Sequence, residues 1–135
     1  MTARVSRILL LLSIVAVAAI VFQPHPTVAS GTVGEFHATL RDLGAPAALT
    51  PSRAEALLNA GMFVPATLLA MLAFDRLSWT AVVASAFLAS LAIETIQGLL
   101  LDARTMQSID VVTNTFGALL GALAGLAVRR LIRPR

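Results

Sequence analysis

Four long apolar stretches determine whether this chain folds in a membrane or in water. They cover about residues 6–22, 51–74, 78–101 and 109–132. At about 1.5 Å of rise per residue, each stretch can cross most or all of a hydrocarbon core about 30 Å thick. Only 13% of the residues are charged and the mean hydropathy is +0.87, whereas soluble domains carry about 25% charge. We predict an all-α integral membrane bundle of four transmembrane helices, forming one domain over residues 1–135.

The first apolar stretch allows two interpretations. Arg4 and Arg7 precede it, as basic residues precede both signal peptides and membrane helices. Residues 27–29, Thr-Val-Ala, have the small-x-small pattern of a cleavage site. The apolar run is, however, at the upper end of the signal-peptide range, and Pro24 and Pro26 separate it from that site. We favour a retained helix over a cleaved signal peptide.

The segment 23–50 is predicted to lie outside the membrane on the extracytoplasmic side. Its prolines break any long helix through it. Thr32 and Glu35 have the spacing of a capping box, and Phe36, Leu40 and Leu43 follow at helical spacing. We therefore expect a short amphipathic helix that begins near Thr32 and lies on the membrane surface.

Polar residues interrupt the later apolar stretches or lie at their borders. An ionisable side chain at the centre of a bilayer costs about 2.5–3.5 kcal/mol, so such residues turn inward, find partners or lie near an interface. In a four-span topology all of them come to one level of the membrane. We name these candidate ligand-binding residues the polar cluster: Asn59, Glu94, Gln97, Arg104, Asp110 and Asn114. Ser90 falls on the same helix face as Glu94 and Gln97.

The arginines predict the orientation. Four spans place both termini on one side, together with Arg4, Arg7, Arg76, Arg129, Arg130, Arg133 and Arg135, while Arg41, Arg53 and Arg104 lie on the other. Basic residues favour the cytoplasmic side, so we predict a multi-pass protein of the bacterial plasma membrane with both termini cytoplasmic. The polar cluster then lies in the outer half of the membrane. Because the arginines serve as membrane anchors in this arrangement, no nucleic-acid partner is predicted.

Three glycines predict close helix packing. Gly117, Gly121 and Gly125 share one face of the last helix with Asp110 and Asn114. A glycine at every fourth position lets another helix approach, because no side chain projects from the contact line. The stripe suits packing within the chain and a homodimer equally well.

These residues resemble the VanZ-like family of membrane proteins. The resemblance covers about residues 55–127, and its motifs are Asn59-x-x-x-Phe63-x-Pro65, Glu94-x-x-Gln97, Arg104, Asp110, Asn114-Thr115 and Gly117-Ala118-x-x-Gly121. Many members carry adjacent acids before the asparagine, whereas Ile109 precedes Asp110 here. The resemblance implies a role in the cell envelope, since the family's namesake is associated with resistance to teicoplanin, a lipid-tailed glycopeptide.

Three functions remain open at this point. The polar cluster could recognise an anionic amphipathic molecule, such as a lipoglycopeptide or a lipid-linked wall precursor, with Arg104 meeting its phosphate or carboxylate. It could belong to an enzyme acting on a lipid-linked phosphate, with Glu94 or Asp110 as acid or base, although no nucleophile is recognisable. It could have only a structural role, holding together the helices of a small membrane subunit of a larger complex. We predict membrane lipids and a lipophilic ligand as partners, no cofactor and no metal site, since the chain has no cysteine and its two histidines lack metal spacing.

Overall fold

The structure is a computed structural model that describes residues 3–22, 26–100 and 107–132. Five helices make up these ranges: α1 (Ala3–Val21), α2 (Pro26–Asp42), α3 (Pro51–Ala73), α4 (Trp79–Leu100) and α5 (Ser108–Ile132). Of these, α1, α3, α4 and α5 are long and apolar enough to cross a membrane. The prediction of an all-α bundle with four membrane-spanning helices is confirmed, and the spans agree with the predicted ranges to within a few residues.

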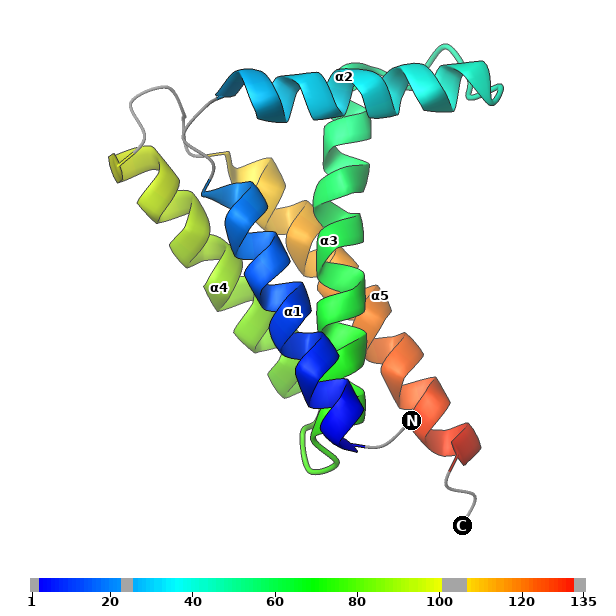
Figure 1. Ribbon diagram of the computed structural model, residues 1–135, viewed down its shortest axis with the longest axis vertical. Helices are drawn as coiled ribbons and strands as arrows, with labels where there is room; N and C mark the ends of the chain where they lie inside the picture. Colours follow the sequence, from blue (N-terminus) through cyan, green and yellow to red (C-terminus); the bar gives the residue numbers. More distant parts are fainter. Residues whose placement is uncertain (1–2, 23–25, 101–106, 133–135) are drawn as a thin grey trace.

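The four spanning helices run alternately up and down, and α2 lies across one end of them (Figure 1). The most extensive contact joins α3 to α5, although α4 separates them in the sequence; α4 packs on α5, and α1 packs on α3. Both termini lie at the end of the bundle opposite to α2 (Figure 1). The α2 end therefore brings together the last residues of α1 and α4 and the first residues of α3 and α5.

Hydroxyl side chains fix where two of the spanning helices begin. Thr50 Oγ1 accepts the backbone N–H of Arg53 at 3.3 Å, and Pro51 takes the first helical position, where a missing N–H costs nothing. At the start of α4, Ser78 Oγ accepts the N–H of Ala81 at 3.1 Å. These caps satisfy backbone donors that have no partner within the helix.

The start of α2 corrects one sequence prediction. The helix begins at Pro26 rather than near Thr32, so Thr32 and Glu35 lie inside it and the predicted capping box is wrong. Proline is favourable in the first turn of a helix, where its fixed φ matches helical geometry. The expectation of a helix between the first two spans is nevertheless correct.

The loop after α2 is held by side chains that bond to its backbone. The chain turns at Gly44, which has a φ of 91°, a conformation that glycine adopts without steric cost. His37 Nε2 forms a hydrogen bond of 2.8 Å with the carbonyl oxygen of Leu49, and Arg41 Nη1 donates to that of Ala45 at 2.8 Å. These contacts give His37 and Arg41 a structural role in joining α2 to α3.

At the opposite end, two arginines satisfy the end of α3. Arg7 Nε donates to the Ala73 carbonyl at 3.4 Å, and its guanidinium lies 5.3 Å from the centre of the Phe74 ring. Arg129 donates to the carbonyl oxygens of Phe74 and Leu77. The last carbonyls of a helix lack intrahelical partners, so these arginines connect α1 and α5 to the turn between α3 and α4.

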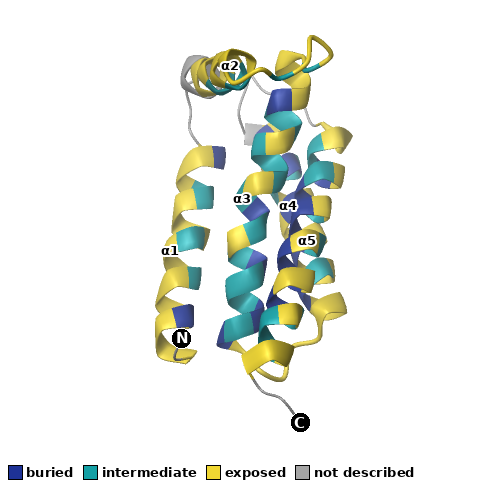
Figure 2. Cartoon of the chain, turned by 90° about the vertical axis from the view of Figure 1, so that its right-hand side faces the viewer, coloured by how far each residue is buried: buried dark blue, intermediate teal, exposed yellow. Residues whose placement is uncertain are grey.

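Exposed residues cover the outside of the spanning helices, and buried residues lie on the faces that meet other helices (Figure 2). Leu11, Leu88 and Phe116 are 63%, 62% and 56% exposed, whereas Ala118 and Ala122 are fully buried. Monomeric soluble proteins rarely expose contiguous apolar surfaces of this extent. Helices in lipid instead associate through small residues, so this distribution agrees with a multi-pass membrane protein.

The glycine stripe explains the close contact of α3 and α5. A Cβ atom added at Gly117 would overlap the backbone of Ala60, and one at Gly125 would lie 2.5 Å from Met71 Cβ. Gly121, between them, is also tightly packed on α3. Of the two predicted uses, packing within the chain is therefore observed. The homodimer stays a prediction.

Candidate functional site

The described members of the polar cluster gather at the α2 end of the bundle. They are Asn59 in α3, Glu94 and Gln97 in α4, and Asp110 and Asn114 in α5. Because α3 and α5 begin at this end and α4 finishes there (Figure 1), all five residues belong to the halves of their helices that are nearer to α2. Arg104 lies outside the described residues.

A side-chain hydrogen bond joins α3 to α5. Asn59 Nδ2 donates to Asp110 Oδ1 at 2.8 Å. Asp110 also lies in the first turn of α5, where the positive end of the helix dipole favours a carboxylate. This bond lies nearer to the α2 end than the contact of Gly117 with Ala60. Because the glycine stripe lets α3 and α5 come close, Asn59 and Asp110 are within reach of each other.

A second polar contact is fully enclosed between α4 and α5. Asn114 Nδ2 donates to Ser90 Oγ at 2.9 Å, and the two side chains are 5% and 0% exposed. Asn114 Oδ1 is also buried, and it has no hydrogen-bond partner within the described residues. Turning the amide about would pair Oδ1 with Ser90 but leave Nδ2 alone instead. One polar atom of Asn114 is therefore unsatisfied in either orientation.

Glu94 holds the start of α5. Its side chain is only 4% exposed, and Oε2 accepts the backbone N–H of Gln107 at 2.8 Å. This contact brings a buried carboxylate to the chain segment that enters α5. Sequence patterns predicted that Glu94 would turn inward, but they contain no signal for a partner that is a backbone group.

Gln97 connects α4 to the end of α1. Its Nε2 donates to the carbonyl oxygen of Val21 at 2.7 Å, and both residues are buried. Val21 ends α1, so its carbonyl lacks a partner within the helix. The first span, which carries no member of the polar cluster, is thereby attached to it.

The polar contacts form a layer that lies nearer to the α2 end than a layer of apolar contacts does. Phe63, Ala86 and Ala118 form a buried apolar group contributed by α3, α4 and α5. One helical turn nearer to the α2 end, the same three helices carry Asn59, Ser90 and Asn114. The bundle therefore changes from apolar to polar within one turn.

The family model for VanZ/LLP1 matches residues 9–129. The chain belongs to the VanZ/LLP1 family. The matched region contains every member of the polar cluster and the three glycines of the stripe, and the resemblance to VanZ-like proteins seen in the sequence motifs is confirmed. No curated protein and no solved structure is significantly similar to the chain.

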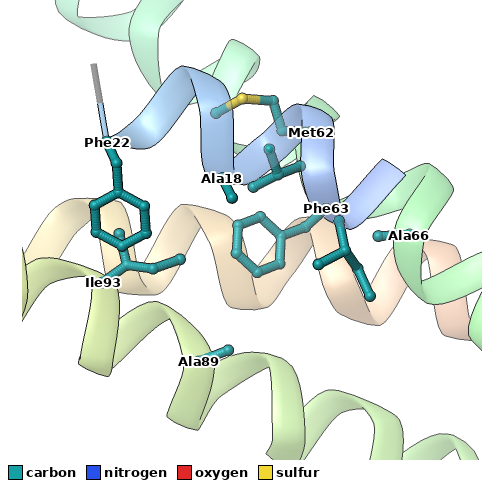
Figure 3. A pocket seen from close by; sticks show the side chains of 9 residues that line it. Ala18, Phe22, Met62, Phe63, Ala66, Ala89 and Ile93 are labelled. Atoms are coloured by element: carbon teal, nitrogen blue, oxygen red, sulfur yellow. The ribbon is translucent and has the colours of Figure 1, made fainter. Parts of the chain in front are cut away.

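The VanZ/LLP1 bundle also contains an apolar groove beside these layers. It lies between α1, α3 and α4 and has a volume of about 160 Å³ (Figure 3). All of its lining side chains are apolar: Ile14, Val17, Ala18, Phe22, Met62, Phe63, Ala66, Ala89 and Ile93. Sequence patterns contain no signal for this groove, since its lining comes from three separate helices.

The chemistry available to this VanZ/LLP1 protein is that of hydrogen bonding and charge. Among the described residues, no three His, Cys, Asp or Glu side chains are grouped as metal ligands would be. The Ser90 hydroxyl is buried and bonded to Asn114. The described site offers two carboxylates, in Glu94 and Asp110, and the amide oxygen of Asn114, which has no hydrogen-bond partner within the described residues.

Proposed function

We propose that this VanZ/LLP1 protein recognises the polar head of an anionic amphipathic molecule at the outer surface of the bacterial plasma membrane. A lipoglycopeptide antibiotic and a lipid-linked wall precursor both have this chemistry. The association of the family's namesake with teicoplanin resistance provides the biological setting. In this proposal the polar cluster lies in the outer half of the membrane and both termini are cytoplasmic.

The observation that carries the proposal is the buried amide oxygen of Asn114, which has no hydrogen-bond partner among the described residues. Buried polar atoms are almost always hydrogen-bonded, and a buried polar atom without a hydrogen bond costs about 1–3 kcal/mol of stability. A cluster that served only to fasten helices would not need a buried amide oxygen without a partner. A polar group of a bound molecule would satisfy it.

The charge of the site makes Arg104 necessary to this function. Glu94 and Asp110 give the described part of the cluster two carboxylates, which would repel an anionic head. Arg104 lies between α4 and α5 in the sequence, and a guanidinium binds phosphate or carboxylate through paired hydrogen bonds. The first turns of α3 and α5, which lie at the same end, add positive potential.

The distribution of arginine supports the proposed orientation. The end that carries the termini has most of the described arginines. They are Arg4, Arg7, Arg129 and Arg130 in the helices, and Arg76 in the turn between α3 and α4. The opposite end carries Arg41 and Arg53. An excess of basic residues is typical of the cytoplasmic side.

The test compares antibiotic protection with protein abundance in a teicoplanin-sensitive bacterial host. Asn114→Leu keeps a side chain that branches at Cγ but removes the amide, and Arg104→Ala removes the proposed anion partner. Both should abolish protection while membrane levels stay normal. Thr95→Val is the matched control, because the Thr95 hydroxyl donates to the Leu91 carbonyl of its own helix, and it should protect like the unchanged protein.

Two results would contradict the proposal. If abundance falls in step with protection in Asn114→Leu and Arg104→Ala, the cluster is a structural fastening. If purified protein releases phosphate from a polyprenyl phosphate and Glu94→Gln abolishes that release, the protein is an enzyme. Native mass spectrometry of the purified protein should instead find a co-purifying anionic amphiphile that both variants lose.

A further inference from the structure

The groove beside the polar cluster has a floor from one helix and walls from two others. Met62, Phe63 and Ala66 of α3 form the floor, and Ala18 of α1 and Ala89 of α4 face each other across it (Figure 3). Small side chains at the walls leave the space unfilled. Because the groove lies within the apolar spans, a molecule that filled it would come from the membrane.

The groove exists because α1 packs on α3 but makes little contact with α4. Ser6 and Val21 are the buried residues of α1, and the intervening surface is largely exposed (Figure 2). Gln97 holds one end through the Val21 carbonyl, and Arg7 holds the other through the Ala73 carbonyl. Between these contacts α1 rests on α3 and does not close against α4.

The volume of the groove suits a slender apolar group, such as part of a hydrocarbon chain. Its volume of about 160 Å³ is close to that of an engineered apolar cavity, about 150 Å³, that stays dry and binds benzene. Ile14, Phe22 and Ala89 are exposed at the rim, so a chain could enter sideways from the lipid.

The groove begins where the polar cluster ends. Phe63 lies one turn from Asn59, and Ile93 immediately precedes Glu94. Along α1 the lining runs from Ile14 to Phe22, a length of about 12 Å at the helical rise. That is close to one leaflet of the hydrocarbon core, about 15 Å. A molecule with its head in the cluster would have its tail at this depth.

We propose that the groove between α1, α3 and α4 holds the hydrocarbon tail of the amphiphile whose head the polar cluster recognises. This inference rests on the proposed function and adds a requirement to it: the ligand has one tail that reaches about one leaflet deep. Gln97, bonded to the end of α1, marks the boundary between head and tail.

The test uses the full chain in phosphatidylcholine vesicles with a trace of dodecyl phosphate that carries a photoactivatable diazirine in mid-tail. After irradiation, peptide mass spectrometry should find label on Met62, Phe63 or Ile93. An excess of unlabelled dodecyl phosphate should remove that label. Label on Leu88, which is 62% exposed, should persist because bulk lipid contacts do not saturate.

A matched pair of variants separates the groove from the general lipid surface. Ala89→Phe puts a ring into the groove and should lower the competable labelling about tenfold, because no room remains for the tail. Ala84→Phe, at an exposed position of α4 outside the groove, should leave it unchanged. Uncompeted label spread equally over Met62 and Leu88 would overturn the inference. The inference would also be overturned if the intact mass of the protein showed that α1 had been cleaved off. Cross-links between two copies of the chain across the groove would overturn it as well.

Two further competitors distinguish the tail site from the headgroup function. Butyl phosphate has the head without the long tail, and dodecanol has the tail without the charge. Dodecyl phosphate should compete about tenfold better than either, since head and tail contacts both contribute. If butyl phosphate competes equally well, the groove inference fails and head recognition stands. If dodecanol competes equally well and Ala89→Phe still removes the label, the tail site stands and the proposed function fails.

Discussion

Replacing Gly117 with alanine tests how closely α3 and α5 approach. The added Cβ would overlap the carbonyl group of Ala60, and helix backbone cannot rotate aside as a flexible side chain can. Overpacking costs about 1–3 kcal/mol, and a backbone neighbour places this site at the upper end of that range. Alanine recovers about 1 kcal/mol through its helix propensity. Separating the helices would also weaken the bond of Asn59 to Asp110, worth about 0.6 kcal/mol.

The net loss of stability in Gly117→Ala is therefore about 2–3 kcal/mol, which lowers the folded-to-unfolded ratio about 30-fold or more. The assay is SDS-induced unfolding in mixed micelles, followed by the fluorescence of Trp79, the single tryptophan. Gly61→Ala is the control, because Gly61 lies in α3 with open space around its Cβ position. That variant should be neutral or more stable by up to about 1 kcal/mol.

Two outcomes would refute this reasoning. If Gly117→Ala unfolds at the same SDS fraction as the unchanged protein, α3 and α5 do not meet at Ala60. If Gly61→Ala is destabilised as much as Gly117→Ala, the loss reflects glycine in general and not the contact. Gly125→Ala gives a further comparison, since its Cβ would lie 2.5 Å from Met71 Cβ, whereas the Cβ at position 117 would overlap the Ala60 carbonyl oxygen. Its cost should be smaller than that of Gly117→Ala.

Three further predictions concern individual hydrogen bonds. A double-mutant cycle of Asn59→Leu and Asp110→Ala should give a coupling energy of about 0.6–1.7 kcal/mol in the same SDS assay, and additive effects would mean that the bond is absent. Gln97→Leu should speed hydrogen exchange at the end of α1 and leave α5 unchanged; equal exchange in both proteins would contradict the attachment of α1. Arg129→Met should lower stability by about 1 kcal/mol, because carbonyls at the end of α3 lose a partly exposed donor, while Arg130→Met should not.

The sequence was sufficient to predict the membrane architecture because lipid imposes simple demands. An apolar run of the right length has few alternatives to a spanning helix, so the predicted spans agree closely with α1, α3, α4 and α5. Because the four spans alternate in direction, they also predicted that Asn59, Glu94 and Asp110 lie at the same depth in the membrane. Helical spacing also placed Ser90 on the same face as Glu94.

The specific partners within the site could not be predicted. Gln97 bonds to the carbonyl of Val21, and Glu94 to the N–H of Gln107. Backbone groups occur at every residue, so sequence alone cannot choose among them. The glycine spacing predicted that a helix would come close to Gly117 but did not identify α3 as that helix.

Two other features show the limits of local patterns. Thr32 and Glu35 have capping-box spacing, yet they lie inside α2, because the pattern also arises in helix interiors. The groove depends on the alanines at positions 18, 66 and 89, which belong to three helices. Periodicity within one helix contains no information about which other helices it meets.

The contact of α3 with α5 also constrains how the protein is made. Ala60 and Gly117 meet although a complete membrane helix is synthesised between them. Membrane helices insert first and associate afterwards, so α3 must wait in the bilayer with Asn59 unpaired until Asp110 and the rest of α5 arrive. We expect nascent chains that end before α5 to be recognised by quality-control proteases, because their third helix exposes both an amide and an unoccupied strip of small residues to lipid.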